Sequence, residues 1–415
     1  MPRVFDRSAL RRVSEERGVP IAELLLREGR RALGSFTLLG ISPVSRYVVR
    51  AALLAAKELE APVMFIASLN QVDVDGGYTG WTPKGFVEHL AREVEELGVE
   101  QPVIVALDHG GPWLKDRHVE EDLGLGEAME AAKRSIEAAL RAGYDVLHID
   151  TTVEPGRVPD PETVARRTVK LIEFAEDVRR SAGLPPVSYE VGSDRWGLRD
   201  EESTARLIAL VKRGLENRGV HEARLLFLVG DVGTVVRPSN TLDTAKAARL
   251  VKLAGDHGLF LKTHSTDFVE NPEEFPRVGV GGANIGPEFA YRQYMAVKTL
   301  EEEARKVLGG EVGALRVVTE EILRDGRWRR YAGGRGLEEL PENEKDFVLG
   351  ISSRYVWSAP RVEEALRSLA SRLSNAGVDA EATILNSLKG RIGHYMRSFG
   401  LERLAERIVP VSKIS

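Results

Sequence analysis

The residues best suited to chemistry lie at the ends of eight short apolar segments spread along the chain. The polar side chains at these ends are, in chain order, Ser42, Asn70 and Gln71, Asp108 and His109, Asp150, Glu190, Asp231, His264 and Asn284. We interpret His109, Glu190 and His264 as the best candidate metal ligands, because two imidazoles and one carboxylate with an open position form a standard catalytic site for a divalent ion. Asp231 lies between Glu190 and His264 in the sequence and could complete the coordination sphere.

The amino-acid composition narrows the possible ligands. The chain has no cysteine, which excludes disulfides, thiolate catalysis and thiolate ligands. We therefore expect a divalent metal held by histidines and carboxylates, zinc in the first place, with nickel, manganese or cobalt as alternatives. His148 alternates with Asp150 along one apolar segment, and we interpret it as a satisfied core residue. The other histidines lie in expected helices or loops without convergent acids and are interpreted as structural: His89, His118, His221, His257 and His394.

The spacing of the apolar segments indicates the scaffold that positions these residues. We expect strands at residues 35–41, 63–69, 103–107, 146–149, 187–191, 225–229, 259–263 and 278–283, with amphipathic helices between them. Near-continuous apolar strands that alternate with helices are typical of a parallel sheet covered on both faces. Eight of them predict a (β/α)₈ TIM barrel, an α/β fold whose site lies at the carboxyl ends of the strands. An open doubly wound sheet is the structural alternative.

The remaining segments predict the domain organisation. We expect a helical lead-in over residues 1–33, the barrel over residues 34–308, and a mainly helical extension over residues 309–415 that packs on the barrel or on a neighbouring subunit. Residues 325–344 are charged and contain glycine, which favours a linker or loop. Residues 353–415 are too short for an independent catalytic domain.

Charge and hydropathy exclude several classes of protein. The chain carries 58 Lys and Arg against 63 Asp and Glu, so it lacks the basic excess typical of nucleic-acid-binding proteins. No apolar run is long enough to span a membrane, and no signal peptide opens the chain, so we expect a cytoplasmic protein. The absence of cysteine, together with abundant Arg and Glu, suggests heat adaptation.

Several motifs carry a resemblance to a known family. They are Asn-Gln-Val at 70–72, Gly-Gly-Tyr-Thr-Gly at 76–80, Asp-His at 108–109 with Gly-Pro at 111–112, His-Ile-Asp at 148–150, Tyr-Glu-Val-Gly at 189–192, His-Ser-Thr-Asp at 264–267, Gly-Pro at 286–287 and Ser-Arg-Tyr-Val-Trp at 353–357. With these motifs the chain resembles the class II ketose-bisphosphate aldolase superfamily. It is most similar to the tagatose-bisphosphate aldolase non-catalytic (Z) subunit family, which includes tagatose/fructose 4-epimerases. The resemblance covers residues 34 to 370 and implies that His109 and His264 hold a divalent metal, with Asp108 as the proton-transfer residue.

The sequence also departs from the superfamily at three places. The aldolases carry a further metal-binding histidine after strand six, where residues 230–237 of this chain contain none, so Glu190, Asp231 or both must replace it or the metal site is degraded. The glycine-rich phosphate cradle after strand seven is replaced by a segment containing Asp267, whose charge would repel a phosphate. The corresponding motif after strand eight is also replaced, so a bisphosphate substrate is disfavoured, although Arg237, Lys262 and Arg354 could still bind one phosphate.

These observations together predict a metal-dependent ketohexose 4-epimerase that interconverts D-tagatose and D-fructose, free or as a 6-phosphate, by retro-aldol and aldol chemistry. We assign catalysis to Asp108, Glu190 and Asp231 and substrate contacts to Ser42, Asn70, Gln71, Asp150, Lys262, Asp267 and Asn284. The glycine-rich segment at 76–80, with Tyr78 and Trp81, is either a cover over the site or an ordinary turn. The alternatives are a non-catalytic stabilising subunit of a separate aldolase, a true aldolase, or epimerisation at carbon 3. We expect a homo-oligomer.

Overall fold

Eight parallel strands form a closed barrel in the computed structural model, which describes residues 3–197, 200–404 and 407–408. The strands pair in chain order and β1 also pairs with β8: β1 (Leu38–Ile41), β2 (Val63–Ser68), β3 (Val103–Gly110), β4 (Val146–Ile149), β5 (Ser188–Gly192), β6 (Arg224–Val229), β7 (Phe260–Thr263) and β8 (Gly282–Ile285). The predicted (β/α)₈ barrel is confirmed, and the open doubly wound sheet is excluded.

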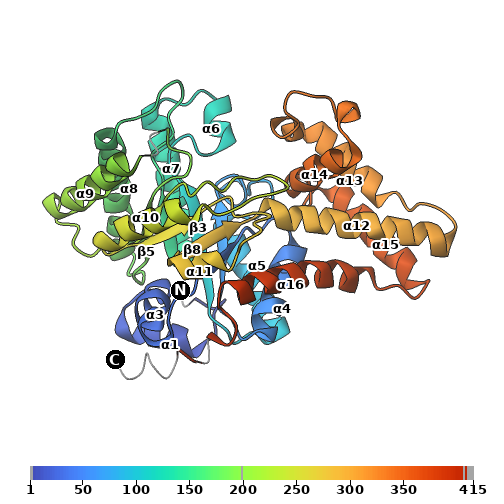
Figure 1. Ribbon diagram of the computed structural model, residues 1–415, viewed down its shortest axis with the longest axis horizontal. Helices are drawn as coiled ribbons and strands as arrows, with labels where there is room; N and C mark the ends of the chain where they lie inside the picture. Colours follow the sequence, from blue (N-terminus) through green and yellow to red (C-terminus); the bar gives the residue numbers. More distant parts are fainter. Residues whose placement is uncertain (1–2, 198–199, 405–406, 409–415) are drawn as a thin grey trace.

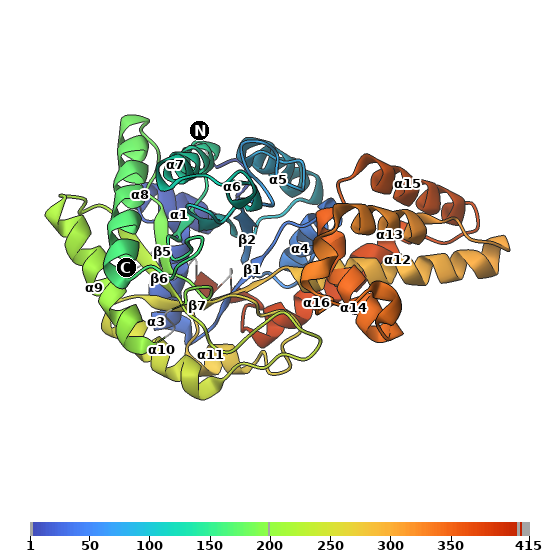
Figure 2. The same cartoon turned by 90° about the horizontal axis from the view of Figure 1, so that it is seen from above.

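A ring of helices covers the outside of the barrel (Figure 2). It consists of α4 (Arg46–Glu58), α5 (Pro83–Leu97), α7 (Leu125–Ala142), α8 (Pro161–Ser181), α9 (Glu201–Asn217), α10 (Thr244–Asp256) and α12 (Pro287–Leu308), with the short helices α6 (Asp116–Glu120) and α11 (Glu274–Val278) in connecting segments. Side-chain caps set where several of these helices begin. The Thr82 hydroxyl accepts a hydrogen bond from the Gly85 N–H, and the Asp160 carboxylate accepts one from the Thr163 N–H.

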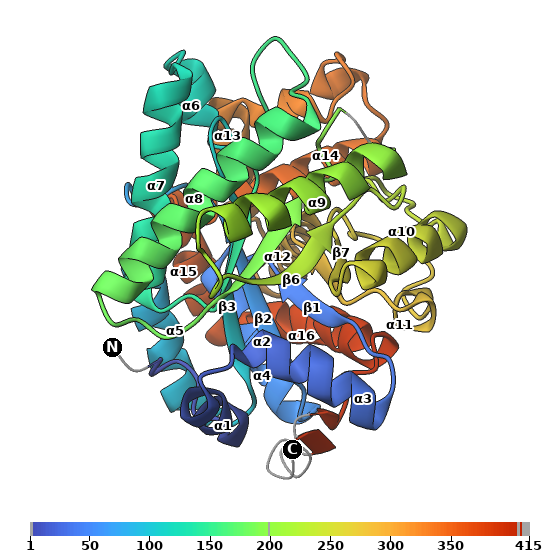
Figure 3. The same cartoon turned by 90° about the vertical axis from the view of Figure 1, so that its left-hand side faces the viewer.

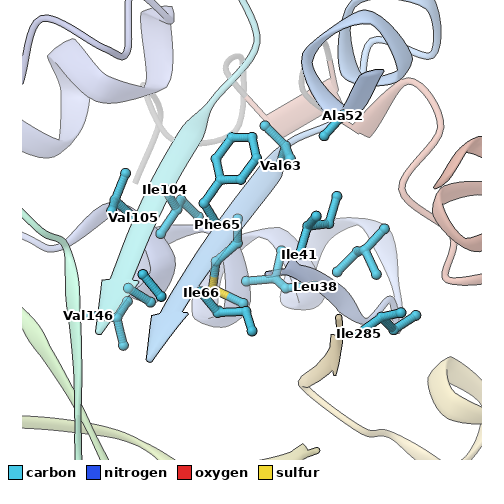
Figure 4. Packing of buried hydrophobic residues seen from close by; sticks show 14 of the residues in the cluster. Leu38, Ile41, Ala52, Val63, Phe65, Ile66, Ile104, Val105, Val146 and Ile285 are labelled. Carbon is cyan, nitrogen blue, oxygen red and sulfur yellow. The ribbon is translucent and has the colours of Figure 1, made fainter. Parts of the chain in front are cut away.

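The strands are buried on both faces, as their unbroken apolar sequences predicted. Figure 4 shows side chains of β1, β2, β3, β4 and β8 packed together, with Ala52 of α4 beside them. Phe65 of β2 is fully buried, and its ring meets that of Phe86 on α5 edge to face, with 6.0 Å between the centroids. Ile66, the next residue along β2, lines a cavity at the mouth of the barrel. Successive side chains of the strand therefore point alternately toward the outer helices and toward the barrel interior.

The last strand is shifted relative to the prediction at residues 278–283. The segment up to Val278 forms α11, and Gly279 ends that helix in the left-handed region with φ of 93°. Strand β8 therefore starts only at Gly282. Glycine at 281 allows close packing here, because a Cβ would lie 2.6 Å from that of Phe260.

The amino-terminal helices close the end of the barrel away from the carboxyl ends of the strands (Figures 1 and 3). They are α1 (Ala9–Arg17), α2 (Ile21–Leu24), the π-helical turn η1 (Leu25–Gly29) and α3 (Arg30–Leu33). Arg11 donates to both carboxylate oxygens of Asp145, at 2.6 and 3.0 Å, and to the backbone carbonyl of Val103 at 3.0 Å. Burial opposes ionisation of Asp145, but Arg11 and Arg3 lower the pKa of its carboxyl below the usual value.

The carboxyl-terminal extension lies to one side of the barrel, and its last helix returns to it (Figure 1). It contains α13 (Ala314–Asp325), η2 (Arg327–Arg330), η3 (Leu337–Glu339), α14 (Glu342–Ser352), η4 (Ser353–Tyr355), α15 (Pro360–Ser374) and α16 (Ala380–Ser398). Helix α16 packs on α4, where Lys389 and Glu58 form an ion pair at 2.6 Å. The extension thus packs on the barrel of its own chain. The segment 325–344, expected to be a linker, contains two 3₁₀ turns and the buried Trp328.

No helix among the described residues is both long enough and apolar enough to cross a membrane.

Candidate active site

A cavity of about 240 Å³ opens at the carboxyl ends of the strands. Eight of the residues singled out from the sequence contribute to its wall: Ser42, Asn70, Gln71, Asp108, His109, His264, Asp267 and Asn284. The other four predicted site residues lie outside this wall, and they are Asp150, Glu190, Asp231 and Lys262.

An irregularity in β3 brings two adjacent side chains into the same cavity. Neighbours on a regular strand point to opposite faces, so Asp108 and His109 should diverge. His109, however, has φ of 50°, and the register between β3 and β4 shifts between Leu107 and Gly110. This bulge turns the chain so that both side chains line the cavity. Gly111 permits the close approach that follows, because a Cβ there would lie 1.6 Å from the carbonyl oxygen of Asp150.

His109 is oriented by a buried carboxylate on the neighbouring strand end. Its Nδ1 lies 2.8 Å from Oδ2 of Asp150, while Oδ1 of Asp150 accepts bonds from the backbone N–H and hydroxyl of Thr152 at 3.0 and 2.6 Å. Burial disfavours the charge on Asp150, but its bonds to His109 and Thr152 and the nearby charges keep its pKa well below the usual value. An ionised carboxylate at this position holds the proton of His109 on Nδ1, which leaves the lone pair of Nε2 facing the cavity.

His264 completes a pair of imidazoles that could share a cation. Its Nδ1 lies 3.0 Å from Nε2 of His109, and its Nε2 is buried without a hydrogen-bond partner. Oδ1 of Asp194, in the loop after β5, lies 3.6 Å from Nδ1 of His264 and is also buried without a hydrogen-bond partner. Imidazole nitrogens and carboxylate oxygens are the donors that a divalent transition metal prefers, and here Nδ1 of His264 lies beside both Nε2 of His109 and the unpaired Oδ1 of Asp194. The residues present therefore fit such an ion.

The donor atoms that converge most closely among the described residues belong to Asp108, His109, His148 and His264, all within 4.8 Å of one another. His148 is fully buried, and both of its ring nitrogens are engaged by the backbone. Its Nε2 lies 2.8 Å from the carbonyl oxygen of Gly192, and its Nδ1 accepts the N–H of His109 at 3.2 Å. Nδ1 of His148 also lies 3.5 Å from Oδ1 of Asp108, so the interpretation of His148 as a core residue stays a prediction, while its contact with the His109 N–H supports the bulge there.

Asp108 lies between the imidazoles and the far wall of the cavity. Nδ2 of Asn284 donates to its Oδ1 at 3.3 Å, and Nε2 of His264 lies 3.6 Å from the same oxygen. Burial alone would raise the pKa of Asp108, but His109 and His264 hold it well below the usual value. Asp108 is therefore a carboxylate in the form that accepts a proton.

The structure does not bring Glu190 and Asp231 to the histidine pair. Glu190 is fully buried in the barrel interior, where its Oε1 lies 2.5 Å from Nζ of Lys262. Asp231 forms an ion pair with Lys246 at 3.0 Å and accepts the Gly233 N–H at 2.8 Å, so it binds the loop after β6. Their positions at strand ends suggested that both carboxylates would meet the histidines. Each is instead paired with a lysine, and the sequence positions of the strand ends do not reveal that pairing. Lys262 is correspondingly engaged with Glu190 and does not line the cavity.

Asp267 occupies the amino-terminal end of helix α12. Its Oδ1 accepts the backbone N–H groups of Gly286 at 3.0 Å and Glu288 at 2.7 Å. These are groups that would otherwise attract an anion such as a phosphate. Burial and the nearby Glu288 outweigh these bonds and raise the pKa of Asp267 to about 7. The anion position at this helix end is thus filled by the protein's own carboxyl group.

The carboxyl-terminal extension forms part of the cavity wall. The sequence motifs indicated only some of its contributing residues. Arg330, Tyr331, Arg354 and Tyr355 all line the cavity. The ring of Tyr78, from the glycine-rich segment, meets that of Tyr355 edge to face at 5.2 Å. The Ser358 hydroxyl donates to the carbonyl oxygen of Tyr78. Only the Ser-Arg-Tyr-Val-Trp motif at 353–357 pointed here. The contributions of residues 330–331 and of Asp194 and Arg195 had no recognised signal in the sequence.

Comparisons with known proteins agree with this architecture. A D-tagatose 6-phosphate 4-epimerase of Agrobacterium fabrum is 26% identical over 396 residues, which cover 88% of this chain and 90% of that protein. A D-tagatose-1,6-bisphosphate aldolase subunit GatZ of Escherichia coli O157:H7 is 25% identical over 359 residues, covering 80% and 83%. The crystal structure of a probable tagatose 6 phosphate kinase from Sinorhizobium meliloti matches with a TM-score of 0.71 at 25% identity and covers 90% of this chain and 97% of that one.

The model of one protein family, described as D-tagatose-1,6-bisphosphate aldolase subunit GatZ/KbaZ-like, matches residues 26–389. This match spans the barrel and most of the extension, including every cavity residue described above. The chain therefore belongs to the GatZ/KbaZ-like family.

Proposed function

We propose that the protein is a metal-dependent ketohexose 4-epimerase that interconverts D-tagatose and D-fructose, or their 6-phosphates, by retro-aldol and aldol chemistry. The observation that carries the proposal is the convergence of His109 and His264 beside the ionised carboxylate of Asp108. The similarity to a protein named D-tagatose 6-phosphate 4-epimerase supports the same reaction.

His109 and His264 would hold the metal, together with the carboxylate of Asp194. Asp194 takes the place that the sequence suggested for Glu190 and Asp231, because it lines the cavity with its Oδ1 3.6 Å from Nδ1 of His264, while those two carboxylates lie outside the cavity wall and are paired with lysines. A bound divalent cation supplies a Lewis acid that stabilises the negative charge developing on the ketose oxygens. Asp150 contributes by holding the ring of His109 in the orientation and tautomer that leave Nε2 free.

Carbon 4 of a ketohexose is not adjacent to the carbonyl at carbon 2, so simple deprotonation cannot invert it. In the proposed reaction Asp108 takes the proton of the carbon-4 hydroxyl, the bond between carbons 3 and 4 breaks, and its electron pair passes to the ketose fragment as an enediolate. The aldehyde fragment turns to present its other face, and the same bond forms again. Asp108 then returns the proton to the new hydroxyl, so no atom is gained or lost.

The fragments must stay in the cavity between the two bond-making steps. Tyr78 and the extension residues Tyr331 and Tyr355 contribute to the wall that would retain them. The segment carrying Tyr78 is held in place by hydrogen bonds: the Tyr78 N–H donates to the Asn70 carbonyl at 2.8 Å, and the Ser358 hydroxyl donates to the Tyr78 carbonyl. Enclosure by these residues distinguishes an epimerase, which keeps both fragments, from an aldolase, which releases them.

The direct test is to incubate the purified, metal-loaded protein with D-fructose and, separately, with D-fructose 6-phosphate, and to separate the sugars by chromatography. We expect the tagatose epimer from at least one substrate, and we expect turnover to disappear in a His264→Ala variant. Failure to form tagatose or its phosphate from either substrate would contradict the proposal. Triose products would indicate an aldolase instead.

A second candidate function is that of a non-catalytic subunit of a class II tagatose-bisphosphate aldolase. The similarity to proteins named as the GatZ subunit of that enzyme favours it. This alternative predicts that the protein co-purifies with a separate aldolase chain and that His264→Ala leaves the activity of the complex unchanged. The convergence of the donor atoms of Asp108, His109 and His264 favours the epimerase, because a purely structural subunit has no need for such a cluster.

A further inference from the structure

A second cavity, of about 370 Å³, lies at the seam between the barrel and the carboxyl-terminal extension. Its wall is formed by α4 and α5 on the barrel side, by α12, and by α15 and α16 of the extension, together with the segment that carries Thr79 and Trp81. Its volume is in the range of small-molecule sites. The catalytic chemistry proposed above uses none of its residues.

Three polar groups in this wall have no hydrogen-bond partner. Gln293 is 1% exposed, and its Oε1 accepts the hydroxyl of Ser45 at 2.5 Å while its Nε2 is unpaired. Trp357 is 4% exposed, and its indole N–H is unpaired. Nε2 of His89 is likewise buried and unpaired. Buried polar groups without partners are unfavourable, and acceptor oxygens of a ligand or water would satisfy the N–H groups of Gln293 and Trp357.

The charged groups around this cavity compensate one another. Arg46 and Arg367 both lie near the carboxylate of Glu363, at 3.8 and 3.9 Å, and Arg50 pairs with Glu93 at 2.8 Å. With its cations paired in this way, the cavity does not favour an anion. Trp81 stacks against His89 with 4.9 Å between the ring centroids, which adds an extended apolar face.

We propose that this cavity binds a neutral polyhydroxy compound of hexose size, as a site distinct from the catalytic cavity. Hydroxyl oxygens would accept the N–H groups of Gln293 and Trp357, and the carbon face of the ring would pack on the aromatic surface of Trp81. The proposal stands on this cavity alone and does not depend on the reaction proposed for the barrel mouth.

The two cavities share a wall, so binding at one affects the other. Tyr78 lines the catalytic cavity, while Thr79 and Trp81 line the second one. On the other side of the seam, Tyr355 lines the catalytic cavity and Ser358 the second one. The bond from the Ser358 hydroxyl to the Tyr78 carbonyl joins the two segments. An occupant of the second cavity would therefore stabilise the segment that covers the catalytic cavity.

Tryptophan fluorescence reports on the second cavity, because Trp81 and Trp357 line it and none of the described tryptophans lines the catalytic one. Variants of the second cavity then separate binding there from an effect passed through the shared wall. Titration of the full-length wild-type protein with D-fructose is expected to give a saturable change in emission. Gln293→Met and Trp357→Phe each remove one donor and should weaken binding roughly 3–10-fold, with Trp81 still reporting. Trp328→Phe is the matched control, since Trp328 also has a buried unpaired indole N–H but lies outside this cavity, and it should bind as the wild type does.

The titration is made with metal-free protein, in which D-fructose is not turned over, so the outcome is independent of whether the protein is an epimerase. The absence of a saturable response to D-fructose in the wild-type protein would overturn the proposal. Equal affinity in the wild type, Gln293→Met and Trp357→Phe would also overturn it, provided that thermal unfolding shows both variants to be folded. A response to inorganic phosphate but not to D-fructose would show an anion site and contradict the assignment of a neutral ligand.

Discussion

Replacing Asp150 with asparagine tests whether this carboxylate sets the tautomer of His109 that the proposed metal site needs. Oδ2 of Asp150 lies 2.8 Å from Nδ1 of His109, and Oδ1 already accepts two bonds from Thr152. An asparagine that keeps its carbonyl toward Thr152 presents an NH₂ group to His109. The proton of the imidazole then moves to Nε2, the nitrogen that the metal needs. Changes in such supporting carboxylates typically weaken metal binding by about 10–100-fold, which corresponds to about 1.4–2.8 kcal/mol.

Competition with a chromophoric chelator would measure this affinity for zinc directly. Thr152→Val is the matched control, because it removes a hydroxyl from Asp150 but leaves the carboxylate beside His109, and we expect a much smaller change. Thermal unfolding of the metal-free proteins would show whether either variant is misfolded. If Asp150→Asn binds zinc as tightly as the wild type, His109 is not a ligand or Asp150 does not set its tautomer.

Three further predictions follow from the geometry. Asp108→Asn should retain metal but lower kcat by about 10²–10⁴, as measured by epimerisation of D-fructose 6-phosphate, and unchanged turnover would exclude Asp108 as the acid and base. Asp267→Asn keeps an acceptor for the end of α12 but removes the charge that Asp267 carries above its pKa of about 7, so in mildly alkaline buffer D-fructose 1,6-bisphosphate should inhibit about 5–30-fold more strongly; an unaltered inhibition constant there would refute the role of that charge. Asp145→Asn leaves Arg11 buried without its main partner and should lower the free energy of unfolding by about 3–5 kcal/mol at pH 7. Because the pKa of Asp145 is depressed in the folded protein, this contribution is present above about pH 4 and is lost as the pH falls further, so denaturant unfolding of variant and wild type should converge in acid.

The fold could be predicted from the sequence because the strands are apolar on both faces and are separated by well-capped helices. The strand whose bounds were predicted least accurately is the last one. Residues 279–282 show little hydrophobic alternation, and the end of α11 determines where β8 begins. The extension was recognised as helical, but its position was not predictable. Contacts such as that between Lys389 and Glu58 join residues far apart in the chain and leave no local signal.

The sequence predicted the candidate site correctly only for residues whose place follows directly from their position at the end of a strand. Asp108, His109, His264 and Asn284 line one cavity, as their place at strand ends suggested. Glu190 sits one layer deeper and is paired with a lysine from β7, a contact that depends on the stagger of the barrel and not on the sequence. Asp194 lies in an irregular loop, where neither periodicity nor a capping pattern indicates a role.

Proton NMR of the reaction in D₂O tests the central claim most directly. The metal-loaded protein would be incubated with D-fructose and with D-fructose 6-phosphate. Retro-aldol and aldol chemistry breaks the bond between carbons 3 and 4 but leaves the hydrogen on carbon 4 in place. We therefore predict that the tagatose epimer forms with protium at carbon 4, and that it does not form after the metal is removed. Deuterium at carbon 4, a product inverted at carbon 3, or unchanged turnover without metal would contradict the account.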